Sequence, residues 1–336
     1  MSNAFIDDEG KLHLPARVIP VPRTVSDAAR GFLQSPVLSL DLSWPVLGDK
    51  SNGRVGDKTA WKDFIAERDA AWARLVADMP PFAGTRERHA VGGATLYELL
   101  PDDVPERNRQ RAVLYVHGGA YVMGGGELSI RGAAAFATAM RCRVYSIDYR
   151  MPPEHPFPVG LNDTVDAWRF LLDRHDPKKA AITGPSAGGG LAASATLKIR
   201  DLGLAMPGAA VLVTPECDLT EIGDTFETNQ DIDVVLKTRL TQPNLLYADG
   251  HDLRDPYISA VFGDFSKGYP PTALFSGTRD LFLSNTVILH RALRRVGIAA
   301  ELHVFEGMPH GGFFGAPEDA ESLAEQVAFL DRVLGV

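Results

Sequence analysis

The sequence predicts an α/β protein with a mostly parallel central sheet and helices on both of its faces. The first observation is that short apolar runs alternate with helical stretches from about residue 95 onward, which is typical of parallel strands joined by helical crossovers. The second is that these runs are apolar throughout rather than at every other residue. Strands that are buried on both faces have this character.

The composition is that of a globular protein and excludes two classes of partner. Of the 336 residues, 45% are hydrophobic and 23% are charged, which excludes a disordered, coiled-coil or collagen-like chain. The formal net charge is −9, and the longest basic cluster is only Arg291, Arg294 and Arg295. Such a surface repels phosphate backbones and anionic lipids. We therefore expect neither a nucleic acid nor a membrane as a partner.

The first 85 residues carry helical patterns and no pattern of a core strand. Ser26 stands at the N-cap position of a helix that includes Phe32 and Leu33. A longer helix is predicted from about Lys58 to Asp78. Its apolar residues fall mainly on one face, as expected for a helix that packs against a core. These residues are Trp61, Ile65, Trp72, Leu75 and Val76.

The alternating elements define the rest of the chain. The predicted strands are residues 112–116, 144–147, 180–183, 209–214, 272–276 and 301–305. The predicted helices are residues 130–140, 161–174, 189–201, 283–296 and 317–333. An acidic stretch with helical patterning only around residues 238–247 interrupts the alternation. We predict an N-terminal helical segment (1–85) that contributes to a cap, an α/β core (86–220 and 255–336), and a cap insertion (221–254).

The cysteines and the N-terminus point to an intracellular protein. Cys142 and Cys217 lie in or beside apolar runs and have no metal-binding spacing, so buried free thiols are expected. The chain begins without the basic residues and apolar stretch of a signal peptide. No apolar run approaches the ~18 residues of a membrane span. We expect a cytoplasmic location.

A G-x-S-x-G motif marks the candidate nucleophile. Gly184-Pro185-Ser186-Ala187-Gly188 follows a predicted strand and opens a predicted helix. This context is that of a nucleophile elbow, a tight turn that raises a serine hydroxyl above the sheet. The alternative is a glycine-rich turn that only joins the strand to the helix. The strand–turn–helix context favours Ser186 as a nucleophile.

A second glycine-rich loop supplies candidate donors for an oxyanion. His117-Gly118-Gly119-Ala120 follows the strand at residues 112–116 and matches the loops whose backbone N–H groups bind an oxyanion. We expect the donors to be the N–H groups of Gly118 and Gly119, together with that of Ala187. Alanine replaces a third glycine at position 120, which requires backbone angles there that accept a Cβ.

A serine nucleophile needs a base and an acid. His310 follows the last predicted strand, and active sites lie at the carboxyl ends of parallel strands. The order serine, acid, histidine along the chain places the acid between Ser186 and His310. Asp280 follows the penultimate strand and is favoured, and Asp218 follows the strand before it and is the alternative. No histidine, cysteine or carboxylate cluster has metal-ligand spacing, so neither a metal nor a cofactor is expected.

Several motifs together resemble the hormone-sensitive-lipase-like family of α/β-hydrolases, the bacterial family IV esterases. The resemblance covers about residues 110–315 and rests on residues 117–120, 148–158, 184–190, 255–259, Asp280 and His310-Gly311. It implies the α/β-hydrolase fold, a helical cap, and a catalytic triad of Ser186, Asp280 and His310. Family members often form homodimers, although no residue here indicates one.

Three positions depart from the family pattern. Pro185 stands where the elbow usually carries aspartate, Ala120 replaces a glycine, and Ser284 stands where a second acid usually follows the catalytic aspartate. None of them removes a member of the triad. The first two are expected to reshape the acyl pocket.

The resemblance implies a serine carboxylesterase that works through an acyl-enzyme intermediate. The acidic insertion and the absence of a broad apolar stripe from the predicted cap favour small to medium soluble esters over lipid droplets as substrates. A lactone hydrolase with the same triad is the nearest alternative. A small-molecule receptor on the same fold is a further alternative, but receptors of this family lose the histidine, and His310 is present. The expected partner is therefore a small-molecule ester.

Overall fold

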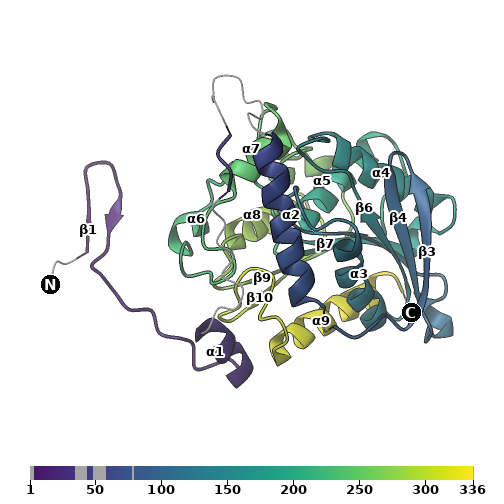
Figure 1. Ribbon diagram of the computed structural model, residues 1–336, viewed down its shortest axis with the longest axis horizontal. Coiled ribbons are helices and arrows are strands. Elements are labelled where there is room, and N and C mark those ends of the chain that lie inside the picture. Colours follow the sequence, from purple (N-terminus) through teal and green to yellow (C-terminus); the bar gives the residue numbers. More distant parts are fainter. Residues whose placement is uncertain (1–3, 35–43, 48–57, 78, 336) are drawn as a thin grey trace.

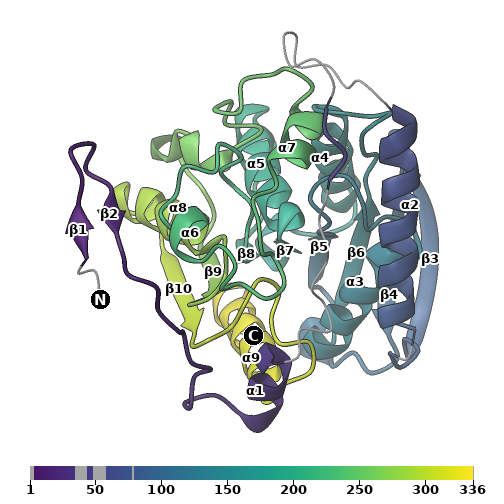
Figure 2. The ribbon, with the colours of Figure 1, turned by 60° about the vertical axis from the view of Figure 1, so that its left-hand side comes forward.

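The computed structural model describes residues 4–34, 44–47, 58–77 and 79–335, and it is built on one eight-stranded sheet (Figure 1). The strand order is β10-β9-β8-β7-β5-β6-β4-β3, with β3 and β10 at opposite edges (Figure 2). All pairs from β10 to β6 are parallel, whereas β4 pairs antiparallel with β6 and with β3. The predicted mostly parallel sheet is thereby confirmed.

The predicted strands and helices agree with the structure to within a few residues. The strands of the sheet are β3 (Gly84–Val91), β4 (Ala94–Pro101), β5 (Ala112–Val116), β6 (Arg143–Asp148), β7 (Ala180–Pro185), β8 (Ala209–Val213), β9 (Thr272–Gly277) and β10 (Ala300–Phe305). The helices are α1 (Asp27–Gln34), α2 (Lys58–Leu75), α3 (Glu127–Met140), α4 (Val159–Leu172), α5 (Ala187–Asp201), α6 (Thr225–Thr228), α7 (Thr241–Ala248), α8 (Leu283–Arg295) and α9 (Pro317–Val333). The short strands β1 (Phe5–Ile6) and β2 (Leu12–His13) form a separate ribbon, and 3-10 turns span Glu106–Asn108, Pro177–Lys179, Ala260–Phe262 and Phe265–Lys267.

The antiparallel pair β3 and β4 was not predicted from the sequence. Strand β3 lies at the sheet edge, where most of its residues are exposed, so it lacks the apolar run of a buried strand. The predicted boundary between residues 85 and 86 falls inside β3, and the sheet therefore begins at Gly84.

Two apolar cores cover the two faces of the sheet. Helices α3 and α9 pack on one face, where Phe136 and Phe329 join the buried side chains of the central strands. Helices α4, α5 and α8 cover the other face with Trp168, Leu191 and Leu289. Cys142 and Cys217 are buried in these cores as free thiols, as predicted. No helix in the described part of the chain is long and apolar enough to span a membrane.

Two helices from the N-terminal segment, α1 and α2, lie within the described residues. Ser26 accepts a hydrogen bond from Ala29 N through its hydroxyl (3.2 Å), which confirms the predicted N-cap of α1. Its own N–H and hydroxyl donate to Glu318, so α1 lies beside the start of α9 (Figures 1 and 2). Helix α2 is described to Leu75, and the predicted end at Asp78 lies outside the described residues.

One apolar cluster joins α2 to the insertion at residues 221–254. Trp61 is buried in this cluster with Phe226 and Leu246 of the insertion. The cluster also includes Val122, from the loop after β5, and Phe282, from the loop after β9. The N-terminal segment and the insertion therefore pack together above the ends of these strands.

A buried ion pair fixes α9 to the sheet. The Arg111 side chain, which is 1% exposed, precedes β5 and binds the carboxylate of Asp331 on α9. The same guanidinium donates to the carbonyl oxygens of Asp331 and Gly335 (both 3.4 Å). The charge of Arg111 is thus withdrawn from water and depends on α9 for its partners.

We predict that Asp331→Ala lowers the free energy of unfolding by about 3 kcal/mol, because it leaves a buried guanidinium without its counter-ion. Urea unfolding followed by circular dichroism measures this change. Glu106→Ala is the matched control, because it breaks an exposed pair with Arg109 and should cost less than about 1 kcal/mol. Equal effects of the two variants would contradict the structural role of the Arg111–Asp331 pair.

Candidate active site

The turn between β7 and α5 holds Ser186 in a strained conformation. Ser186 has a φ of 55°, in the left-handed region that residues with a Cβ rarely adopt. The glycines on either side permit a close approach to β5. A Cβ on Gly188 would lie 2.1 Å from the carbonyl oxygen of Val116, and a Cβ on Gly184 would lie 2.5 Å from it. The predicted elbow thus needs glycine at both positions because of this contact.

The three residues of the predicted triad lie in hydrogen-bond contact. His310 Nε2 is 2.9 Å from the hydroxyl oxygen of Ser186, and His310 Nδ1 is 3.0 Å from a carboxylate oxygen of Asp280. Ser186 follows β7, Asp280 follows β9, and His310 follows β10. The carboxyl ends of three parallel strands therefore bring together residues that are far apart in the sequence.

The two candidate acids differ in their contacts. Asp280 is fully buried, and its carboxylate also accepts hydrogen bonds from the Ser276 hydroxyl (2.6 Å) and from Phe282 N (2.9 Å). Asp218 is buried as well, but its carboxylate bonds to the backbone N–H of Thr220 and to its hydroxyl. The structure places Asp280, and not Asp218, against the imidazole.

The electrostatic surroundings favour a charged imidazole. Burial lowers the pKa of His310, but the hydrogen bond and the charge of Asp280, together with the charge of Asp233, outweigh burial and raise the pKa above its usual value. These carboxylates therefore stabilise the imidazolium that forms when His310 accepts a proton.

The predicted oxyanion loop lies against the serine. A Cβ on Gly118 would lie 3.3 Å from Ser186 Cβ, and one on Gly119 would lie 2.0 Å from the carbonyl oxygen of Met123. Ala120 has a φ of 52°, so its Cβ stands in the left-handed region that residues other than glycine rarely adopt, and not in the favourable backbone angles that alanine was expected to require. In the described part of the chain, no acceptor takes a hydrogen bond from the N–H of Gly118, Gly119 or Ala187. These three donors remain available to a substrate oxygen.

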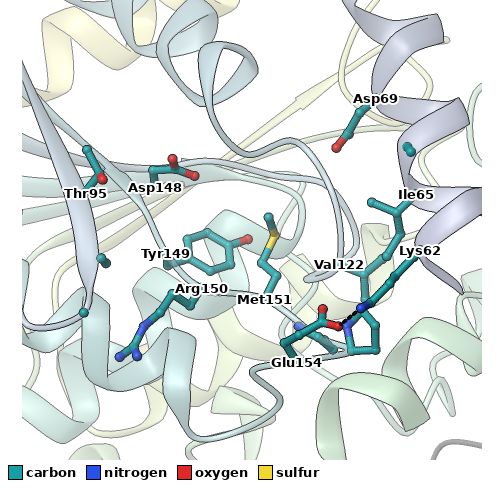
Figure 3. Close-up of a pocket in the computed structure, with 15 residues that line it drawn as sticks. Lys62, Ile65, Asp69, Thr95, Val122, Asp148, Tyr149, Arg150, Met151 and Glu154 are labelled. Atoms are coloured by element: carbon teal, nitrogen blue, oxygen red, sulfur yellow. Dashed lines mark ion pairs between the residues drawn. The ribbon is translucent and has the colours of Figure 1, made fainter. Parts of the chain in front are cut away.

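A pocket of about 410 Å³ opens at Ser186 and His310. Its walls are mainly apolar and come from α2, from α3, from the oxyanion loop and from residues 235–240 of the insertion. A second cavity of about 510 Å³ lies between a neighbouring face of α2 and the residues after β6 (Figure 3). It contains the ion pair of Lys62 with Glu154 (2.6 Å) and is not lined by Ser186. The first pocket is therefore the candidate substrate site.

Asp233 is a site residue that the sequence did not reveal. Its side chain is fully buried, and one carboxylate oxygen accepts hydrogen bonds from Leu281 N (2.9 Å) and His310 N (3.1 Å). The other oxygen accepts from Val235 N and Leu236 N. Burial raises the pKa of Asp233 to about 6, which the charge of His310 opposes. Within the acidic stretch that was predicted to be a cap insertion, this carboxylate binds the loops that carry Asp280 and His310.

Position 284 also links the insertion to the core. Ser284, where the family pattern has an acid, accepts a hydrogen bond from Thr225 N through its hydroxyl (2.9 Å). Its own N–H donates to the Thr225 hydroxyl (2.9 Å). The serine thus joins α6 of the insertion to α8.

The comparisons with known proteins agree with this geometry. A family model described as the alpha/beta hydrolase fold matches residues 113–314. The chain belongs to the α/β-hydrolase family. The hydrolase is similar to the crystal structure of an esterase, E25, with a TM-score of 0.84 and 33% identity over 96% of this chain and 99% of that one.

Two further relatives indicate which group of α/β-hydrolases the chain resembles. An esterase from the bacterial hormone-sensitive lipase family has a TM-score of 0.76 and 28% identity, covering 92% of the hydrolase and 99% of that chain. An acetyl-hydrolase of Streptomyces hygroscopicus is 33% identical over 236 residues, which are 69% of the hydrolase and 79% of the relative. The resemblance to hormone-sensitive-lipase-like esterases is thereby confirmed.

One group of side chains in the described part of the hydrolase has metal-ligand geometry. Donor atoms of Glu87, His89 and Glu98 lie within 4.8 Å of one another. The sequence spacing could not indicate this group, because pairing of β3 with β4 brings Glu87 opposite Glu98. Glu98 already binds His89 (2.9 Å) and the guanidinium of Arg143. We assign no function to this group.

We predict that Asp233→Asn lowers kcat/KM of the hydrolase about tenfold or more. Each carboxylate oxygen accepts two backbone N–H groups, so an amide NH2 in place of either oxygen would lose two hydrogen bonds and face two donors. A base must be neutral to accept a proton, so the raised pKa of His310 places the acid limb of the pH profile above about 6.5. Removing the charge of Asp233 should move this limb to lower pH. The measurement is kcat/KM for p-nitrophenyl acetate between pH 5 and pH 9.

The matched control is Asp231→Asn, because Asp231 is exposed and its φ of 61° suits asparagine. It should change neither the rate nor the pH profile. An Asp233→Asn enzyme that is slower with the acid limb in its original place would reduce Asp233 to a purely structural role.

Proposed function

We propose that this hydrolase is a serine carboxylesterase that cleaves small to medium esters through an acyl-enzyme intermediate. The observation that carries the proposal is the continuous hydrogen-bond chain from Ser186 through His310 to Asp280, with distances of 2.9 Å and 3.0 Å. A nucleophile, a base and an orienting acid in this arrangement are the requirements of acyl transfer.

In the first half of the proposed reaction, the Ser186 oxygen attacks the ester carbonyl carbon and His310 Nε2 takes the hydroxyl proton. The electron pair of the carbonyl moves to its oxygen, which accepts hydrogen bonds from the N–H groups of Gly118, Gly119 and Ala187. The tetrahedral intermediate then expels the alcohol, which receives its proton from His310. The acyl group stays on Ser186.

In the second half, water attacks the acyl-enzyme while His310 again takes the proton. The intermediate collapses with the Ser186 oxygen as leaving group, and His310 returns the proton to it. Throughout, Asp280 accepts a hydrogen bond from His310 Nδ1, which fixes the tautomer and stabilises the imidazolium. The raised pKa of His310 agrees with this role.

The names of relatives and the size of the pocket support the substrate class. Relatives are named acetyl-hydrolase, esterase and carboxylesterase. A pocket of about 410 Å³ lies in the range that accommodates a small ligand. Its mainly apolar walls suit an acyl chain, with the glycine-rich loop at the reacting carbonyl.

We predict that Ser186→Ala lowers kcat by about 10⁴-fold or more, by analogy with serine knockouts in other triads. Hydrolysis of p-nitrophenyl acetate measures this loss. Ser194→Ala is a matched control on α5, because Ser194 donates to Pro256 O (3.3 Å) and does not touch the triad. If Ser186→Ala kept a tenth of the activity, Ser186 would not be the nucleophile.

The choice of acid gives a separate prediction. Asp280→Asn should lower kcat about 10³- to 10⁴-fold, because an amide cannot stabilise the imidazolium and favours the wrong tautomer. Asp218→Asn should cost less than about tenfold, since Asp218 bonds only within its own loop. The rates of the two purified variants, compared at equal folded content, decide between the acids. A larger loss in Asp218→Asn would overturn the assignment.

A further inference from the structure

The pocket at Ser186 carries two arginine side chains and, among the described residues, no carboxylate. Arg68 comes from α2 and Arg131 from α3, two helices that pack against each other. Much of the remaining wall is apolar, with Trp72 and Leu128 near the two arginines in the sequence. This local charge is opposite in sign to the net charge of −9 of the chain.

Neither arginine has an ion-pair partner in the described part of the chain. The Arg68 guanidinium lies 4.9 Å from the centre of the Phe64 ring, and its Nε is buried without a hydrogen-bond acceptor. Arg131 is half-buried, and the carboxylate one turn before it, Glu127, binds both terminal nitrogens of Arg86 (2.6 and 3.0 Å). The hydrogen bond to Arg86 mainly lowers the pKa of Glu127, and the charge of Arg131 adds a smaller effect.

Several arginines elsewhere in the molecule have the partner expected for a charge removed from water. Four side chains that are no more than about a third exposed bind a carboxylate. These are Arg111 with Asp331, Arg143 with Glu98, Arg200 with Asp201 and Arg239 with Glu227. Arg68 and Arg131 have no such partner among the described residues, and both line the pocket at Ser186. Arg279, which is also part-buried and not in an ion pair in the described part of the chain, donates instead to the carbonyl oxygen of Pro20 (2.7 Å).

The residues that adjoin the two arginines in the sequence contact segments near the oxyanion loop. Asp69, next to Arg68, accepts a hydrogen bond from Gly124 N at the end of that loop (2.9 Å). Gly132, next to Arg131, packs so closely on β5 that a Cβ there would lie 2.3 Å from the Tyr115 hydroxyl. Gly124 and Tyr115 both line the pocket and flank the loop on which the proposed mechanism depends. Arg68 and Arg131 themselves line the pocket that holds Ser186 and His310.

We propose that the preferred substrate of this site is an ester that carries a carboxylate group, which Arg68 and Arg131 bind. The inference rests on the proposed esterase function and narrows its substrate class. A guanidinium binds a carboxylate through paired N–H donors. In a pocket with apolar walls such a contact is stronger than in water. The reacting carbonyl would then lie over Ser186 while the carboxylate is held at the wall.

A general electrostatic role for the arginines makes a different prediction. Positive charge near the reacting carbonyl would stabilise the oxyanion of every ester alike. Its removal would slow charged and neutral esters by the same factor. Carboxylate recognition instead changes the ratio of the two rates, so this ratio is the quantity to measure.

The experiment uses the full chain and two pairs of esters that differ only in charge. In the first pair, monomethyl glutarate carries a carboxylate on the acyl side, and methyl glutaramate carries the neutral amide in its place. Acetoxyacetate and acetoxyacetamide place them on the alcohol side. Acid release in a pH-stat at pH 7.5 gives kcat/KM for each ester. Comparison of the two pairs shows whether the enzyme recognises a carboxylate on the acyl side or on the alcohol side of the ester.

We expect the wild-type enzyme to prefer the carboxylate member of at least one pair by about tenfold or more, since tenfold corresponds to about 1.4 kcal/mol. Arg68→Gln and Arg131→Gln should each reduce that preference several-fold, and the double variant should abolish it. Arg295→Gln, an exposed arginine on α8, is the matched control and should leave the preference intact.

The possible failures are distinguishable. Hydrolysis of none of the four esters, together with none of p-nitrophenyl acetate, would reject the proposed esterase function itself. Hydrolysis with equal or lower rates for the carboxylate members would reject the inference and leave the esterase function intact. A carboxylate preference that survives in the double variant would also overturn the assignment to Arg68 and Arg131.

Discussion

The packing of the elbow against the end of β5 is the contact on which the site depends. Gly184 and Gly188 have no Cβ, so the turn can lie directly on the carbonyl oxygen of Val116. This contact supports the left-handed conformation of Ser186 and sets its position. The oxyanion loop begins immediately after Val116, so the same contact sets the distance between the serine and the N–H donors. A Cβ at either glycine would therefore disturb both parts of the site together.

The insertion completes the site rather than only covering it. The loops after β9 and β10 carry Asp280 and His310. The backbone N–H groups of Leu281, in the first loop, and of His310, in the second, donate to the carboxylate of Asp233. This carboxylate also adds negative charge beside the imidazole. The position of Asp233 therefore affects both the position and the pKa of the proposed base. Because the insertion also lines the pocket, substrate contacts there can affect the triad.

The sequence was sufficient for features that depend on local patterns. The elbow, the glycine loop, and the acid and histidine after two strands are short motifs at strand ends, and these ends meet in a parallel sheet. Asp233 could not be recognised, because it lies in an acidic stretch and its partners are backbone groups distant in the sequence. Strand β3 has no apolar run because it lies at the sheet edge. No motif in the sequence includes Arg68 or Arg131, since only the packing of α2 on α3 brings them into one pocket.

The central claim is that Ser186 is the nucleophile, and a covalent label tests it most directly. The native enzyme is treated with a fluorophosphonate, digested with protease and examined by mass spectrometry to locate the phosphonyl group. The account predicts one adduct, on the peptide that contains Ser186, with loss of esterase activity in proportion to labelling. An adduct on another residue that abolishes activity, or full activity after complete labelling of Ser186, would contradict it.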